Sequence, residues 1–207
     1  MGTSMVIMRR GSSRDKTLSN IAKIRKASFA VAFASLSIVL HIYKYPYPLY
    51  PALSFDLAGV PLAIAMLYSI DTGFLSSLIF YLGALMLTTD PTRVIGPSMK
   101  VLAELSTSIP FALVYRSMLS KSANENKAWL VSFVVAFTCR VGIMTLANYV
   151  ISPHWMIWAR WAESYEFAYK ATLMMLPHVA LFNAIVVLYV VPLAIAVWKS
   201  IRRYMHM

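Results

Sequence analysis

Acidic residues, cysteine and glycine are scarce in this sequence of 207 residues. Only 8 residues are Asp or Glu, there is one cysteine, and the 7 glycines are scattered along the chain. The single cysteine, Cys139, excludes an internal disulfide and a cysteine metal cluster. The glycines form no GxxxxGK[ST] pattern, so the sequence has no P-loop that could hold the phosphates of ATP. Charged residues make up 13% of the chain, about half of their usual share in soluble proteins.

Apolar residues take the place of the missing charges. They form 59% of the sequence, and the mean hydropathy is +0.66. A helix needs roughly 20 apolar residues to cross a bilayer, so the chain has room for about six spans with short loops. We therefore predict an all-α integral membrane protein with six transmembrane helices. The apolar runs that predict them are residues 27–42, 57–70, 74–87, 97–115, 128–150 and 171–198.

Three further segments have compositions that are typical of turns or of surface structure. Residues 43–56 hold three prolines and four tyrosines, which favours a rigid aromatic loop. The sequence Asp71, Thr72, Gly73 predicts a tight turn between two spans. The tryptophans and tyrosines of residues 152–169 indicate a short interfacial helix.

The basic residues are unevenly distributed. Thirteen of the 19 Lys and Arg residues fall in residues 1–26, 116–127 and 199–207, which six spans place on one side of the membrane. By the positive-inside rule, both termini are cytoplasmic. The net charge of +11 is therefore an orientation signal and no sign of nucleic-acid binding. We divide the chain into a basic cytoplasmic N-terminal segment (1–26), a six-helix domain in the cell membrane (27–198) and a basic cytoplasmic tail (199–207).

Ionisable residues inside the spans are the first candidates for a functional site, because an unpaired charge is costly in a bilayer. Lys100 and Glu104 are four residues apart and share a helix face. Arg140, in the next run, lies at a depth from which it can reach Glu104. Glu104 and Arg140 form either a structural ion pair or a contact to a ligand, and Lys100 either joins that site or extends to the lipid headgroups.

Asn148 and Asn183 are the other polar candidates. An amide offers donors and acceptors, which suits the imide-like edge of a flat heteroaromatic ligand, and hydrogen bonding between helices is the alternative. His41 and His178 are isolated in apolar runs, which favours structural roles. The sequence contains no spacing typical of a metal site or of a nucleophile elbow. We expect no metal, no cofactor and no enzymatic activity.

The first apolar run carries a stripe of small side chains on one helix face, formed by Ala27, Ala30, Ala34 and Ser37. Small residues allow two helices to approach closely in a bilayer. The stripe is either a packing seam inside the protein or a docking face for a partner, and the composition leaves both interpretations open.

Several of these segments together resemble a known family. Residues 47–61 resemble the loop and second-helix start of the substrate-binding (S) components of energy-coupling factor (ECF) transporters, nearest the riboflavin-type subfamily. Residues 96–116, 144–149 and 176–183 are similar to parts of the fourth, fifth and sixth helices of that subfamily. Residues 30–34 are similar to the AxxxA stripe of the family.

The resemblance implies a subunit for vitamin uptake, with riboflavin as the first candidate, that binds its ligand near the outer leaflet. It also implies two kinds of protein partner: a transmembrane coupling subunit, docked on Ala27, Ala30 and Ala34, and two cytoplasmic ATPases. Under the resemblance, the ligand-binding residues are Tyr47, Tyr50, Asp56, Lys100, Glu104, Asn148 and Asn183.

Three positions depart from the family pattern. Val186 stands where the family has a lysine, Lys100 stands in place of an asparagine, and Gly59 stands in place of a second acid. Because these positions fall where a ligand would be recognised, an S component for another small nutrient (a thiamine precursor, a deazapurine or pantothenate) is an alternative. A membrane assembly factor without cargo is another, and it would have a Glu104–Arg140 pair that fills the interior and leaves no cavity.

Overall fold

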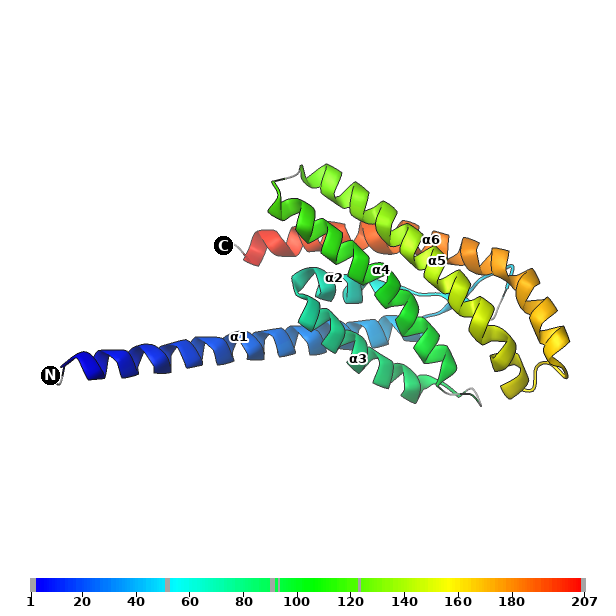
Figure 1. Cartoon of the computed structure of the whole chain (residues 1–207), viewed down its shortest axis with the longest axis horizontal. Coiled ribbons are helices and arrows are strands. Elements are labelled where there is room, and N and C mark those ends of the chain that lie inside the picture. The colour runs from blue at the N-terminus through cyan, green and yellow to red at the C-terminus, as the bar shows by residue number, and fades with distance from the viewer. Residues whose placement is uncertain (1–2, 51–52, 90–91, 93, 123, 206–207) are drawn as a thin grey trace.

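The computed structural model describes residues 3–50, 53–89, 92, 94–122 and 124–205, with residues 3–17 and 205 described by their backbone alone. Within these residues the chain forms six α-helices and one antiparallel pair of short strands (Figure 1). The elements are α1 (Thr3–Ile42), β1 (Tyr45–Pro46), β2 (Ser54–Phe55), α2 (Gly59–Tyr68), α3 (Ile70–Leu87), α4 (Ile95–Ser120), α5 (Glu125–Trp158) and α6 (Tyr165–Met205).

The all-α class is confirmed, and four of the helices have the length and composition of membrane spans. These four are α1 over Leu18–Ile42, α3, α5 and α6. Helix α2 has 10 residues, which at 1.5 Å per residue is too short to cross a bilayer alone. Helix α4 is long, but it carries Lys100, Glu104 and several serines. The run 57–70, predicted as a membrane span, thus forms the short helix α2 inside the bundle.

Helix α2 is the central element of the bundle. It packs against α1, α3, α4 and α6, and Figure 1 shows it in the middle of the bundle. Its side chains Met66 and Leu67 are buried in the main apolar cluster together with Phe111 of α4 and Val187 of α6. Because α2 is apolar on all sides, it is stable only when other helices surround it.

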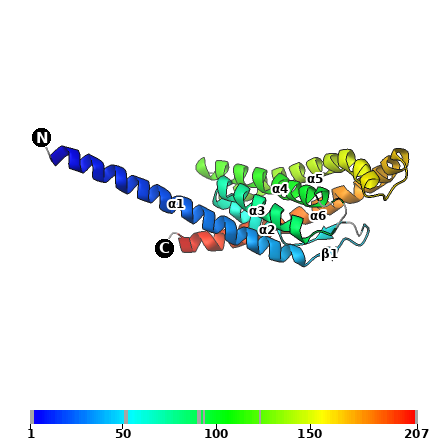
Figure 2. The same ribbon diagram turned by 90° about the horizontal axis from the view of Figure 1, so that it is seen from below.

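The two ends of the bundle differ in what they contain. Figures 1 and 2 show the C-terminus and the N-terminal part of α1 at one end, where α1 projects well beyond the other helices. The strands, the connection between α3 and α4, and the connection between α5 and α6 lie toward the opposite end. We call this opposite end the loop end.

Asp71, Thr72 and Gly73 do not form the predicted tight turn. Ser69 alone breaks the helix, with an extended backbone, and its side-chain oxygen accepts a hydrogen bond from the Thr72 N–H at 3.1 Å. Ser69 is therefore the N-cap of α3, and Asp71 and Thr72 belong to the first turn of that helix. Asp71 suits that position because a negative charge is favourable at a helix N-terminus, and it also pairs with Lys26 of α1 at 2.8 Å.

The predicted interfacial helix over residues 152–169 is wrong. Helix α5 continues to Trp158, and after a short turn α6 begins at Tyr165. Pro153 lies inside α5 without ending it. Tyr149 of α5 and Tyr169 of α6 are joined through their hydroxyl groups, so the two helices remain paired up to the loop end.

The small-residue stripe of α1 is a packing seam. Ala30, Ala34 and Ser37 are completely buried, whereas Ala27 is exposed. The seam faces α3, since the Ser76 hydroxyl donates to the Ala30 carbonyl at 3.1 Å. The predicted docking role requires side chains that are open to a partner, and Ala30 and Ala34 are not open in this structure.

Candidate functional site

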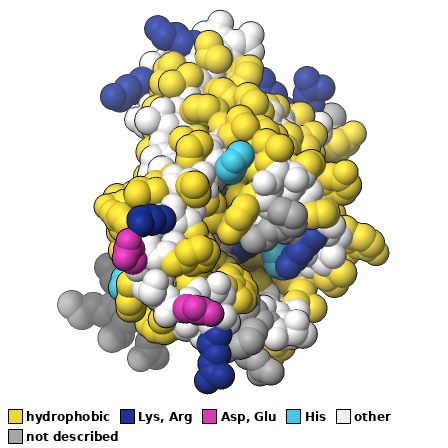
Figure 3. All heavy atoms as spheres, turned by 90° about the vertical axis from the view of Figure 1, so that its right-hand side faces the viewer, with side chains coloured by type: hydrophobic (Ala, Val, Ile, Leu, Met, Phe, Trp, Pro, Cys, Tyr) yellow, Lys and Arg dark blue, Asp and Glu magenta, His cyan; other side chains and the backbone are white. Residues whose placement is uncertain are grey.

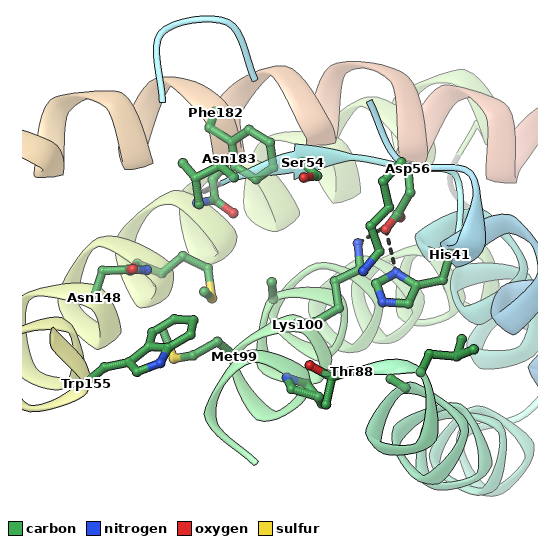
Figure 4. A pocket seen from close by; sticks show the side chains of 18 residues that line it. His41, Ser54, Asp56, Thr88, Met99, Lys100, Asn148, Trp155, Phe182 and Asn183 are labelled. Atoms are coloured by element: carbon green, nitrogen blue, oxygen red, sulfur yellow. Dashed lines mark hydrogen bonds and ion pairs between the residues drawn. The ribbon is translucent and has the colours of Figure 1, made fainter. Parts of the chain in front are cut away.

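A cavity of about 240 Å³ lies at the loop end of the bundle. Its walls come from the end of α1, the strand pair and the residues after it, the end of α3, and helices α4, α5 and α6 (Figure 4). His41, Asp56, Lys100, Asn148 and Asn183 provide much of its polar surface. An assembly factor with a filled interior would lack such a space. Figure 3 views this end of the molecule, where a few basic and histidine side chains lie among mainly hydrophobic ones.

Lys100 is held at the cavity wall by two carboxylates. Its Nζ lies 2.8 Å from Asp56 Oδ1 and 2.9 Å from Glu104 Oε1. The predicted shared face of Lys100 and Glu104 is confirmed by the second contact. Lys100 therefore turns into the protein and does not extend to the headgroups.

Glu104 continues this network to Arg140, as the spacing of α4 and α5 predicted. The guanidinium Nη1 donates to Glu104 Oε2 at 3.2 Å and to Thr107 Oγ1 at 2.9 Å, and Nε donates to Asn183 Oδ1 at 3.0 Å. Both charged side chains are completely buried, and neither lines the cavity. The geometry favours a structural Glu104–Arg140 ion pair over a direct contact to a ligand. Glu104 contacts Lys100 and Arg140 contacts Asn183, so the pair holds two residues of the cavity wall in position.

Gly59 makes room for the Glu104 carboxylate. A Cβ atom at this position would overlap Glu104 Oε2 and would lie 3.0 Å from Glu104 Cδ. The carboxylate of Glu104 on α4 thus occupies the space where a side chain at this position of α2 would lie.

Asp56 connects the residues after β2 to α1 and α4. His41 Nδ1 lies 2.7 Å from Asp56 Oδ2, and the Ala58 N–H donates to Asp56 Oδ1 at 3.0 Å. Tyr189 of α6 donates its hydroxyl to the Asp56 carbonyl at 2.8 Å. Burial would raise the pKa of Asp56, but the Lys100 charge and the hydrogen bonds from His41 and Lys100 hold the pKa well below its usual range. Asp56 is therefore a carboxylate.

The two asparagines keep part of their hydrogen-bonding capacity. Asn148 Nδ2 donates to the Met144 carbonyl at 2.8 Å, and Asn148 Oδ1 accepts from Ser152. Asn183 Nδ2 donates to the Val179 carbonyl at 2.9 Å while its oxygen accepts from Arg140. Each amide retains one N–H and one acceptor position, and both residues line the cavity.

Tyr47 and Tyr50 do not line the cavity. Tyr47 is buried in an aromatic cluster, with ring centroids 5.6 Å from Phe55 and 5.7 Å from Phe182, and Tyr50 packs against the same cluster. Of this cluster, Phe182 reaches the cavity wall. The two tyrosines therefore fix the strand pair to α6, and the ligand contacts expected of them stay a prediction.

Sequence analysis missed several lining residues. His41 was assigned a structural role, but it also lines the cavity, and its position four residues after Ser37 continues the stripe of α1 toward the interior. Trp155 was assigned to an interfacial helix, yet it lines the cavity and donates its indole N–H to Thr92 Oγ1 at 2.6 Å. Lys44, Met99 and Phe182 were not considered. Among the described residues, no group of three or more His, Cys, Asp or Glu side chains could hold a metal ion.

Comparisons with known proteins find a similarity in structure. No protein-family model and no curated protein matches the sequence. Among solved structures, the chain is similar to one described as the S component of a bacterial ECF transporter, with a TM-score of 0.69 and 17% sequence identity. The similarity covers 89% of this chain and 99% of that one. The chain therefore has the fold of an ECF S component, and it carries a polar cavity at one end of that fold.

Proposed function

We propose that this chain is the substrate-binding subunit of an ECF-type uptake transporter and that it binds a small planar nutrient in the cavity at the loop end. One observation carries the proposal. In a chain with the fold of an S component, polar side chains from α1, α4, α5, α6 and the residues after β2 converge on a cavity of about 240 Å³. Lone polar groups are costly inside a membrane protein, and their convergence on a space is typical of a binding site.

The distribution of charge supports an orientation. The described parts of the basic segments 1–26 and 199–207 lie at the end opposite the cavity, which by the positive-inside rule supports cytoplasmic termini and a cavity toward the exterior. The chain contains no P-loop, so uptake requires ATPases and a coupling subunit as partners. Because Ala30 and Ala34 are buried, we assign the coupling contact to exposed positions of α1, among them Ala27 and Ala32.

The sequence resemblance and the cavity volume favour different ligands. The sequence resemblance points to riboflavin. The cavity volume favours a smaller nutrient, since apolar cavities of roughly 150 Å³ hold a benzene ring and sites for drug-sized ligands have about 300 Å³ or more. Riboflavin, a tricyclic flavin with a ribityl chain, requires a larger space than this cavity of about 240 Å³.

A ligand panel tests the proposal. The full chain, purified in detergent, is mixed with riboflavin, a thiamine precursor, a deazapurine and pantothenate, and its thermal unfolding is followed. A ligand at a thousandfold excess over its Kd raises the stability by about 4 kcal/mol. Binding of riboflavin also quenches its fluorescence.

A matched pair of variants separates binding from folding. Asn148→Ala removes an amide from the cavity wall, and its hydrogen bonds are confined to its own helix, so it should weaken binding while the protein still folds. Asn126→Ala changes an exposed amide at the other end of α5 and should leave the affinity unchanged. Failure of every panel member to shift the unfolding temperature would overturn the proposal.

A further inference from the structure

The charged groups at the cavity do not balance. Among the described residues, its charged lining side chains are Lys44, Asp56 and Lys100. Asp56 and Lys100 form an ion pair at 2.8 Å and compensate each other. Among the described residues the side chain of Lys44 has no hydrogen-bond or ion-pair partner, and only its backbone N–H donates, to the Ile42 carbonyl. One positive charge therefore remains at the cavity.

The cation of the ion pair faces the space, whereas the carboxylate is hidden. The side chain of Lys100 is 18% exposed and that of Asp56 is 2% exposed. An ammonium group has three N–H donors, and Lys100 uses two of them, on Asp56 and Glu104. Asp56 already accepts from Lys100, His41 and the Ala58 N–H. A ligand at this wall therefore meets an unused N–H donor on a positive charge.

Lys44 is an exposed residue that lies close enough to Asp56 and Lys100 to be influenced by both charges. Burial lowers its pKa, Asp56 raises it in opposition, and the nearby charge of Lys100 lowers it again. An anion that lies against both ammonium groups would form charge-assisted hydrogen bonds and would remove this repulsion. Because one positive charge is uncompensated, a monoanion such as a carboxylate fits better than a dianionic phosphate.

The opposite part of the wall suits a ring. Asn148 and Asn183 each keep one N–H and one acceptor position, which match the paired donor and acceptor of an amide or imide edge. Met99, Met144 and Trp155 line the space with apolar surface, which favours a flat aromatic body. The volume of about 240 Å³ corresponds to one or two rings.

We propose that the substrate is a heteroaromatic carboxylate of one or two rings, with its carboxylate against Lys44 and Lys100 and an amide-like ring edge against Asn148 and Asn183. This inference rests on the proposed function, because the site is the same cavity. It assigns a recognition role to Lys44, a residue of the segment between α1 and β1.

The test compares carboxylates with the corresponding carboxamides. The full chain in detergent is titrated with pyridine, pyrimidinedione and pteridine carboxylates, with their carboxamides, and with riboflavin. We expect at least one carboxylate to bind about tenfold or more tightly than its carboxamide, because charge-assisted hydrogen bonds are stronger than neutral ones. Lys44→Met should abolish this preference, whereas Lys170→Met, which changes an exposed lysine of α6, should keep it.

The outcomes separate the two proposals. A carboxamide that binds as tightly as its carboxylate, or a preference that survives in Lys44→Met, overturns the assignment of an anionic substrate. Tight binding of riboflavin without any response to the carboxylates also overturns it, but it leaves the proposed uptake function standing. If no compound of this series or of the vitamin panel binds, the uptake function fails as well.

Discussion

At the scale of single residues, a buried row of alternating charges is the dominant feature. Asp56, Lys100, Glu104 and Arg140 follow one another at contacts of 2.8, 2.9 and 3.2 Å. Isolated charges in such an interior are strongly destabilising, and each of these is tolerated because its neighbours have the opposite sign. The stability of the bundle should therefore respond to the balance of charges more than to the loss of any one contact.

Removal of one charge from the row tests this account. Arg140→Gln leaves Glu104 with Lys100 as its remaining ion-pair partner and should destabilise the protein by about 3–5 kcal/mol. The double variant Glu104→Gln/Arg140→Gln removes both charges and should recover part of that loss. Thermal unfolding in detergent measures both changes. A double variant no more stable than Arg140→Gln would contradict the role of charge balance.

Gly59 gives a second test at this scale. Gly59→Ala places a methyl group against the Glu104 carboxylate and should destabilise the protein by about 1–3 kcal/mol through overpacking. Gly142→Ala is the control, because nothing lies within 4 Å of a Cβ at that position of α5 and alanine is the better helix former. Equal unfolding temperatures for the two variants would show that Glu104 is not held against α2.

At the scale of elements, the seam between α1 and α3 fixes the position of His41. Ala30, Ala34 and Ser37 bring the two helices close together, and His41 follows on the same face, where it reaches Asp56. A displacement of α1 would therefore be transmitted to one wall of the cavity.

A larger side chain in the seam should separate the helices. Ala34→Leu replaces a completely buried alanine and should destabilise the protein by about 1–3 kcal/mol and weaken ligand binding in parallel. Ala32→Leu, on the exposed face of α1, should change neither property. Ligand titration and thermal unfolding on the same samples check this, and normal stability of Ala34→Leu would mean that the seam is open.

Helical periodicity predicted much of this arrangement. The four-residue spacing of Lys100 and Glu104 and the depth of Arg140 predicted contacts that the structure contains, since both depend on regular helix geometry. Asp56 could be placed in the network by resemblance alone, because it lies in an irregular segment whose path depends on tertiary contacts. For the same reason Tyr47 and Tyr50 were assigned to the ligand, although they pack against α6.

Predictions made from residue type alone are wrong where two structural environments favour the same residues. Tryptophans are frequent at membrane interfaces and in binding cavities, so Trp155 was assigned to the interface although it lines the cavity. The motif Asp71, Thr72, Gly73 is common in turns, but a serine at the preceding N-cap position made it the start of α3. His41 was predictable, since it extends the stripe of α1 by one further turn.

At the scale of the whole molecule, we predict that the chain binds a ligand but does not drive its uptake. Purified and reconstituted alone into vesicles, it should bind a ligand of the panel without accumulating it, because it contains no ATP-binding motif. Coexpression with the coupling subunit and ATPases of an ECF module should restore uptake. Accumulation by the isolated chain, measured with radiolabelled ligand, would contradict the role of a substrate-binding subunit.

The alternating row of charges also limits how the recognition of this cavity can be redesigned. Reversal of Lys100 to an acid would bring together three negative groups in the interior, so a library that varies one position at a time would return mostly unfolded chains. Variants in which two neighbouring residues of the row exchange their charges keep the net charge of the row constant. Lys44 lies outside the row, so under our proposal ligand selectivity can be altered there by a single substitution.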